Sequence, residues 1–506
     1  MPPEVSRSGA FCDRTGEPKI WGIPECARMY DKVIRGGIVV TPDEQFPADV
    51  GIIGETIAAI GHDLDGSEII DATGCLVMPG GVDSHCHIEQ LRADGSTDEE
   101  SFHTASASAF AGGTTTVITF ASQTKGRPIG PDLAAYRRLA TAASLDYSFH
   151  QIITDPTDAV IRQDIPALVE AGIRSLKVFL TYDPLHVDDR GFLRILAAAR
   201  RAGALVTVHC ENYDAIGWMT EALLAAGLTA PKYHAWSRPV AVEREAVSRA
   251  IALAELVDQP IQIFHVSCAE VAEEIARAQA RGVKVWAETC PQYLALTAAD
   301  MDRPGFEGAK FMCSPPPRDA GAAGGLWEQI RRGTIDIVSS DHSGFSFEGT
   351  RGKRMAGDAP VFRDIANGVP GLAARMMLLF SEGVASGRIT PSVFVRLTSF
   401  NPACLFGLAR KGRLTPGADA DIVLWDAAKR ITLTNAMMQH AIDYTPYEGR
   451  MVTGVPVLTM RRGAVVMREG VVSAPVGSGR FIGRAPYDLI RPTGRLANGF
   501  DPSAFA

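Results

Sequence analysis

The stretch GGVDSHCH, residues 80–87, follows the apolar run 75–78, which is typical of a buried strand. Because side chains alternate between the two faces of a strand, His85 and His87 point the same way and Cys86 points the other way. Two imidazoles on one face at a strand end are placed to hold one metal ion. An isolated His-X-His pair is as often two surface histidines, so the rest of the chain decides between these interpretations.

Length and charge limit the classes of protein to which the chain can belong. Its 506 residues are too many for a single small hydrophobic core. This length predicts one large domain with an accessory unit, or two to three smaller domains. The net charge of −8 and the pI of about 5.8 argue against nucleic acid or an anionic membrane as a partner. Both of these partners require clustered Lys and Arg.

The compartment follows from three features of the sequence. No apolar run approaches the roughly 18 residues that a membrane helix needs. The N-terminus lacks the basic and then apolar pattern of a secretory signal. The nine cysteines are scattered without a CxxC pair, and several lie within apolar runs, as buried thiols in a reducing compartment do. We therefore expect a cytoplasmic protein.

Both chain ends have the texture of short β-strands. Alternating apolar segments punctuated by Gly, Pro and Asp occupy residues 32–70, and similar segments return at 421–425 and 452–466. This pattern predicts a small β-sandwich domain built from residues 31–75 and 409–474. Residues 1–30 are expected to form an irregular N-terminal extension. The tail, residues 475–506, is a candidate oligomer contact.

The middle of the chain, residues 76–408, alternates strand-like apolar runs with amphipathic, Ala-rich stretches. Eight such runs predict a (β/α)8 TIM-like barrel. A doubly wound sheet is the alternative, but it requires a Gly-rich phosphate turn after its first strand, and the sequence has none there. The expected strands are 76–78, 115–120, 147–153, 176–180, 205–209, 261–265, 283–287 and 335–338. The expected helices include 101–111, 132–143, 190–201, 242–256 and 270–281.

Chemistry-bearing side chains recur at the ends of these strands. In a barrel of this type the active site lies at the carboxyl ends of the strands. Any one such histidine is more often an ordinary polar residue than a ligand, but their joint placement at one end of one barrel favours a metal site. The candidates are His85, His87, Lys177, His209, His265 and Asp341.

Lys177 lies within the apolar strand SLKVFL, residues 175–180. Burial of an ammonium group is costly and favours the neutral, nucleophilic amine. A neutral amine can capture carbon dioxide to form a carbamate, whose two oxygens can bridge two metal ions. A lysine that snorkels to the barrel rim is the alternative, and the residues alone leave both interpretations open.

The chain resembles the dihydropyrimidinase and D-hydantoinase family of the amidohydrolase superfamily, which are cyclic-amide hydrolases. The resemblance extends from about residue 32 to 470. His-X-His alone is not specific, but the set of motifs is specific in combination. The matching stretches are GGVDSHCH, SLKVFLTY, VTVHCEN, FHVS, AETCPQYL, EGAKFMCSPPPRD, SSDH, NGVPG, NPACLFGL and KGRLTPGADADIVLWD.

The resemblance implies a pair of zinc ions. His85, His87 and Asp341 would hold one Zn²⁺, and His209 and His265 would hold the second. Lys177, as N6-carboxylysine, would bridge them together with a hydroxide that attacks the substrate. Asp341 would also act as the general base that passes the hydroxide proton to the leaving ring nitrogen.

The resemblance also implies three substrate-binding residues. Tyr182 matches a tyrosine that hydrogen-bonds the developing oxyanion, although an aromatic packing residue is the alternative. Ser314 in CSPPPRD and Asn367 in NGVPG match positions whose backbone groups hold the amide edge of the ring. Two ordinary turns rich in Pro and Gly are the alternative for these two positions.

The implied reaction opens a 5,6-dihydropyrimidine (dihydrouracil or dihydrothymine) or a 5-substituted hydantoin to an N-carbamoyl amino acid. Allantoinase or cyclic-imide hydrolase activity is the alternative within the same chemistry, and allantoinases do not usually carry the tyrosine. A non-catalytic dihydropyrimidinase-related scaffold protein is the alternative from another class, although all six ligand positions are filled here. The resemblance implies a homotetramer or dimer.

Three stretches depart from the family pattern and bear on specificity. His342-Ser343-Gly344-Phe345 follows the aspartate where the family usually has Cys and Pro. Residues 88–92 are more polar than in many hydantoinases, and Asp183 follows the tyrosine where a lysine is common.

Overall fold

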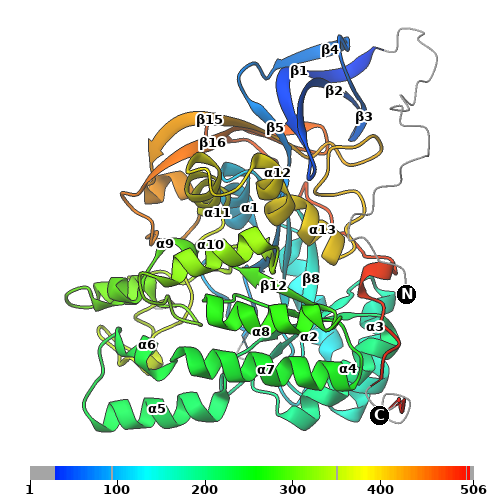
Figure 1. Cartoon of the computed structure of the whole chain (residues 1–506). Helices are drawn as coiled ribbons and strands as arrows, with labels where there is room; N and C mark the ends of the chain where they lie inside the picture. Colours follow the sequence, from blue (N-terminus) through cyan, green and yellow to red (C-terminus); the bar gives the residue numbers. More distant parts are fainter. Residues whose placement is uncertain (1–28, 93–94, 349–350, 497–498, 502–506) are drawn as a thin grey trace.

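The computed structural model describes residues 29–92, 95–348, 351–496 and 499–501, and these are organised around two nine-stranded sheets. Most of the expected N-terminal extension, residues 1–28, lies outside the described residues. Figure 1 shows one sheet at the top of the molecule and the other surrounded by helices below it.

The lower sheet is the predicted barrel, and its strands are parallel. Near the end of the barrel sequence, β13 pairs with β12, and β14, a few residues further on, pairs with β6. This stretch therefore closes the sheet on itself. The strands are β6 (Gly81–His87), β7 (Thr114–Ala121), β8 (Asp146–Ile152), β9 (Ser175–Phe179), β10 (Leu205–His209), β11 (Ile261–Ile263), β12 (Val285–Thr289), β13 (Ile335–Val338) and β14 (His342–Ser343).

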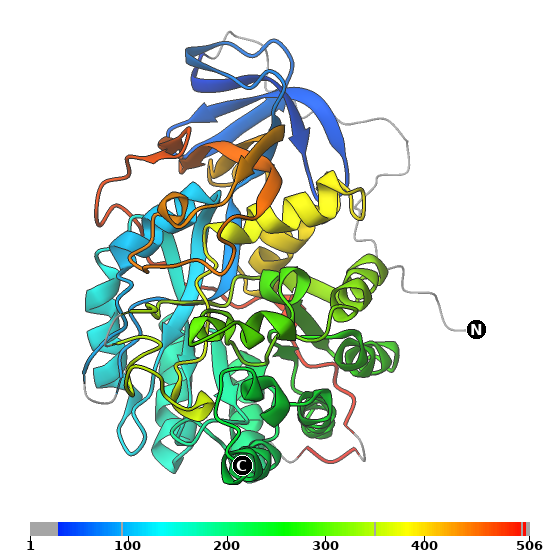
Figure 2. The ribbon, with the colours of Figure 1, turned by 90° about the vertical axis from the view of Figure 1, so that its left-hand side faces the viewer.

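Helices lie outside these strands, as Figures 1 and 2 show. In α4 (Asp189–Ala202), Phe192, Ile195 and Ala199 form a buried stripe at helical spacing, and Asp188 caps the first turn. The other helices are α1 (Phe102–Ala111), α2 (Ile129–Ala140), α3 (Ile165–Glu170), α5 (Tyr213–Ala225), α6 (Tyr233–Ser237), α7 (Val240–Leu256), α8 (Ala269–Ala280), α9 (Pro291–Ala295), α10 (Ala322–Arg332), α11 (Ala374–Leu379), α12 (Pro391–Val395) and α13 (Asn401–Leu405).

The first expected barrel strand, 76–78, is in fact part of the other sheet. Strand β5 (Leu76–Pro79) pairs with strands from both chain ends, and β6 directly after it is the first strand of the barrel. Gly80 makes the passage between the sheets possible, because a Cβ there would lie 2.3 Å from Oγ1 of Thr115. Both sheets bury this run, so its apolar character does not decide which sheet it joins.

The upper sheet is built from both chain ends, as predicted. Val50, Ile422 and Leu458, from its two halves, share one hydrophobic cluster. Its strands, besides β5, are β1 (Tyr30–Val40), β2 (Gln45–Ile53), β3 (Thr56–Gly61), β4 (Gly66–Asp71), β15 (Ile422–Thr432), β16 (Met451–Arg461), β17 (Ala464–Arg468) and β18 (Val471–Val472). The domain boundaries at residues 31–75, 76–408 and 409–474 stay a prediction.

The described part of the tail packs against the chain's own barrel. Phe481 contacts the rings of Tyr147 and Phe149, and the buried guanidinium of Arg484 donates to Oγ of Ser175 at 2.8 Å. The red segment in Figure 1 follows the side of the barrel close to α3 and α4. A role of residues 475–506 in an oligomer stays a prediction.

The cysteines and the helices bear on two expectations drawn from the composition, namely buried thiols and the absence of a membrane span. The seven cysteines there are free, with Cys75 and Cys404 half-buried and the other five buried. Across residues 29–92, 95–348, 351–496 and 499–501, no helix combines the length and the apolar character needed to cross a bilayer.

Candidate metal centre

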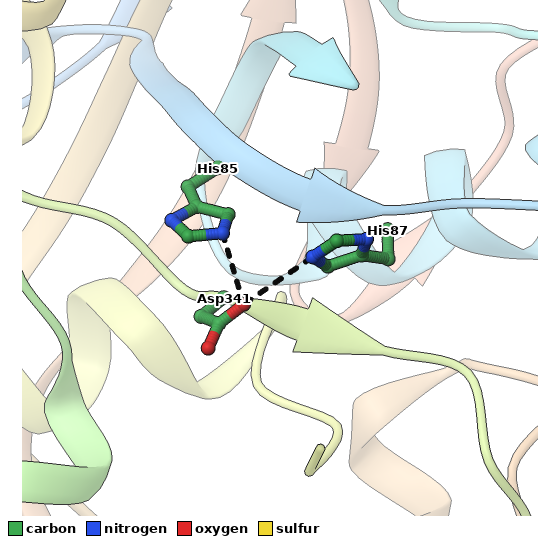
Figure 3. A group of neighbouring side chains, drawn as sticks. All are labelled: His85, His87 and Asp341. Atoms are coloured by element: carbon green, nitrogen blue, oxygen red, sulfur yellow. Dashed lines mark ion pairs between the residues drawn. The ribbon is translucent and has the colours of Figure 1, made fainter. Parts of the chain in front are cut away.

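His85, His87 and Asp341 form a compact group at the carboxyl end of the barrel (Figure 3). Oδ1 of Asp341 lies 3.1 Å from Nε2 of His85 and 3.5 Å from Nε2 of His87. Both imidazoles come from one face of β6, while Cys86 points away, toward the carbonyl of Ile118. The closure of the barrel by the 335–343 stretch brings Asp341 opposite them. Two imidazole nitrogens and a carboxylate suit a divalent metal ion such as zinc.

Two further side chains orient these histidines. Nδ1 of His85 lies 2.6 Å from Oε1 of Glu288 on β12, and Nδ1 of His87 lies 2.7 Å from Oε1 of Gln90. With a hydrogen on each Nδ1, each Nε2 lone pair is free to bind a cation. No role was predicted for Glu288, and Gln90 was noted only as part of the polar stretch 88–92. A glutamate inside an apolar strand was the available signal for Glu288, because a buried carboxylate requires a partner.

The charges of this group stabilise one another. Burial by itself would raise the pKa of Asp341, but the imidazoles of His85 and His87 hold it well below its usual value. Burial would lower the pKa of His85, yet the carboxylates of Asp341 and Glu288 raise it above the usual value. Asp341 is therefore an ionised carboxylate at neutral pH, which is the form that binds a metal ion and accepts a proton.

His209 and His265 form a second group beside the first. Nδ1 of His209, at the end of β10, lies 2.9 Å from Nε2 of His265, just beyond β11. The rings of His85 and His265 are 5.4 Å apart. Burial lowers the pKa of both His209 and His265 well below the usual value, so both are neutral potential ligands. Glu211, for which no role was predicted, has a carboxylate oxygen 2.7 Å from Nε2 of His209 and 2.7 Å from the guanidinium of Arg238.

Lys177 on β9 is completely buried, which excludes the alternative that it snorkels to the rim. Its Nζ has no hydrogen-bond partner among the residues that the structure describes. Instead it lies 4.2 Å from the ring centroid of Phe264 and 4.7 Å from that of Phe179. Burial lowers the pKa of Lys177 to about 7, so a large fraction of the amine is neutral at physiological pH. An unpartnered, partly neutral amine beside two imidazole groups fits conversion to a carbamate.

The predicted substrate-binding residues lie in loops at this end of the barrel. The half-buried Tyr182 has its ring 5.2 Å from that of His209, and removal of its hydroxyl from water raises its pKa, which keeps the group a donor. Oγ of Ser314 lies 3.2 Å from Nε2 of His234. Oδ1 of Asn367 is buried and lacks a hydrogen-bond partner within the described part of the chain.

Three of these positions have a left-handed backbone that non-glycine residues rarely adopt. The φ angles are 68° at Tyr182, 41° at His265 and 47° at Asp341. Such strain occurs where the surrounding structure over-determines a conformation, and it is concentrated at functional sites. It orients the three side chains where their strands end.

Residues 76–466 match the profile of the amidohydrolase family. The chain belongs to this family. A D-hydantoinase of Rhizobium radiobacter is 42% identical over 461 residues, which covers 90% of this amidohydrolase and 99% of the relative. A D-phenylhydantoinase of Escherichia coli is 39% identical over 463 residues, or 90% and 98% of the two chains.

A solved structure gives the same assignment for the fold. The crystal structure of a dihydropyrimidinase from Brevibacillus agri is 40% identical to this amidohydrolase and superposes with a TM-score of 0.87. The match covers 90% of this chain and 99% of the other. The predicted family is therefore confirmed.

We expect Glu288→Gln to weaken the binding of a divalent metal ion, with Zn²⁺ as the probe, by about 10–100-fold, because the variant loses the charge that orients His85 and raises its basicity. Competition with a chromogenic chelator measures this affinity. Glu255→Gln, at an exposed ion pair on α7, serves as the matched control and should bind zinc as the wild type does. Equal affinities for the Glu288 variant and the wild type would contradict the orienting role.

Proposed function

We propose that this amidohydrolase opens 5-substituted hydantoins or 5,6-dihydropyrimidines to N-carbamoyl amino acids. The observation that carries the proposal is the buried amine of Lys177, which has no hydrogen-bond partner among the described residues and lies near the imidazoles of His209 and His265. The relatives named D-hydantoinase and D-phenylhydantoinase, which match almost over their whole length, support this class of substrate. Cytoplasmic location and a homotetramer or dimer stay predictions.

We infer that two Zn²⁺ ions bind at the centre. His85, His87 and Asp341 would hold one ion, His209 and His265 the other, and Lys177, as N6-carboxylysine, would supply oxygens to both. The neutral amine of Lys177 would add to carbon dioxide and release one proton, which leaves a carbamate anion whose negative charge the two cations would balance. When bound, such a metal pair makes water a nucleophile near neutral pH and polarises the scissile carbonyl.

The chain's own residues then position the substrate and move the proton. The Asp341 carboxylate accepts the proton of the attacking water and delivers it to the leaving ring nitrogen. The Tyr182 hydroxyl donates a hydrogen bond to the oxygen on which negative charge develops. The backbone groups of Ser314 and Asn367 hold the amide edge of the ring, which places the scissile carbonyl against the metal centre.

The mouth of the site is where substrates of the same chemistry would be distinguished. The carboxylate of Asp183 accepts a hydrogen bond from the hydroxyl of Tyr213, and the guanidinium of Arg92 lies 5.9 Å from the ring centroid of Phe345. These polar loops leave allantoin and cyclic imides as alternative substrates. A scaffold protein remains the alternative in another class, and it predicts protein without metal or turnover.

The test is a turnover panel combined with metal analysis of the purified full chain, loaded with zinc and bicarbonate. We expect about two zinc ions per chain and faster ring opening of hydantoin, phenylhydantoin, dihydrouracil or dihydrothymine than of allantoin or succinimide. Preference for allantoin or succinimide would contradict the proposal and indicate an allantoinase or a cyclic-imide hydrolase instead. Metal-free protein without turnover would contradict the proposal and favour the scaffold.

We expect Lys177→Ala to lose nearly all turnover and part of its bound zinc, because the oxygens shared by the two ions are gone. Added short carboxylic acids, such as acetate or propionate, should restore part of the activity by occupying the vacated space. Lys429→Ala, at an exposed ion pair with Glu469, is the matched control. Full turnover by Lys177→Ala without any added acid would refute the bridging role.

We expect Tyr182→Phe to lower kcat by about 10²–10³-fold, because one donor to the oxyanion is removed. Its zinc content should equal that of the wild type, since the phenol is not a proposed ligand. Steady-state kinetics and elemental analysis of the same sample give both quantities. If zinc were lost instead, the role assigned to Tyr182 would be wrong.

A further inference from the structure

Lys353 is a second fully buried lysine, and its ammonium has a different environment from that of Lys177. Its Nζ donates to the backbone carbonyls of Met312 at 3.1 Å, Ala366 at 2.8 Å and Gly368 at 2.6 Å. An ammonium has three N–H donors, so these three carbonyls use all of them. Burial lowers the pKa of Lys353 to about 7, and the three carbonyls favour the charged form, which has a donor for each of them.

The three carbonyls belong to the two segments that carry the proposed substrate-binding backbone. Met312 lies two residues before Ser314, and Ala366 and Gly368 lie on either side of Asn367. The N–H of Gly368 also donates to the Met312 carbonyl at 3.0 Å, so the two segments meet at this point. Lys353 therefore holds the peptide groups flanking Asn367 in a constant position relative to the 312–314 segment.

Neighbouring contacts prevent these segments from shifting independently. On the 312–314 side, Nε2 of His234 lies 2.9 Å from the carbonyl oxygen of Cys313. On the other side, Gly368 has a φ of 127°, and a Cβ there would lie 2.4 Å from Oγ of Ser343 in β14. The segment around Gly368 is thus packed directly against β14, the strand that follows Asp341. Lys353 contacts both this segment and Met312.

We propose that Lys353 is a positioning residue that sets the spacing between the backbone groups of Ser314 and Asn367, and so the fit of the amide edge of a cyclic substrate. The inference rests on the proposed function. Lys353 acts through the two segments and not on the scissile carbonyl. Its removal should therefore weaken binding of ground state and transition state alike, which raises KM more than it lowers kcat.

The experiment compares Lys353→Met with the wild type as zinc-loaded full chains. We expect KM to rise about tenfold while kcat changes less than about threefold, with unchanged zinc content. Hydrogen–deuterium exchange should accelerate at residues 312–314 and 366–369 and stay unchanged in the strands that carry the proposed metal ligands. Lys429→Met, at an exposed ion pair with Glu469 in the other sheet, is the control for loss of a lysine and should match the wild type in every readout.

Lys353→Gln retains two N–H donors and provides a second variant if Lys353→Met does not fold. Its KM and exchange rates should fall between those of the wild type and those expected for a variant that has lost all the N–H donors of Lys353. Unchanged KM and exchange in a folded variant would overturn the proposal, and so would faster exchange throughout the barrel, which indicates a merely structural lysine. Failure of the proposed function is a different result, in which the wild type itself turns over none of the panel substrates.

Discussion

The contact of the Asp341 carboxylate with the imidazoles of His85 and His87 is the interaction on which the rest of the site depends. It forms only where the barrel closes. Asp341 lies between β13 and β14, and β14 pairs with β6, which carries both histidines. The imidazoles keep the pKa of the buried carboxylate low, and the carboxylate in turn stabilises charge on His85. Closure of the barrel therefore also assembles this candidate metal-binding group.

Burial gives the remaining ionisable groups of the centre their chemical character. Lys177 is surrounded by Phe264 and Phe179, which offer its amine no hydrogen bond, and burial lowers its pKa to about 7. Burial likewise keeps His209 and His265 neutral. The apolar barrel interior thus provides a partly neutral amine at the proposed carboxylation site and neutral imidazoles at the proposed ligand positions.

Buried polar side chains around the centre control geometry. Glu288 and Glu211 select which nitrogen of His85 and of His209 faces the centre. Lys353 fixes backbone positions in the same way, since its ammonium donates to three carbonyls in two loops. In each case a charged group removed from water is stable only with its partners in place, so the same contacts that satisfy it also fix the positions of the functional groups.

The sequence by itself determined the barrel, the second sheet from both chain ends, and the candidate ligands at the strand ends, because alternating apolar runs and strand periodicity are local properties. It predicted the wrong sheet for residues 76–78, and it assigned no role to Glu288, Glu211 or Lys353. Only the tertiary structure decided these points. Which strand a buried run pairs with, and which partner a buried charge meets, depend on residues far away in the chain that become neighbours when the barrel closes.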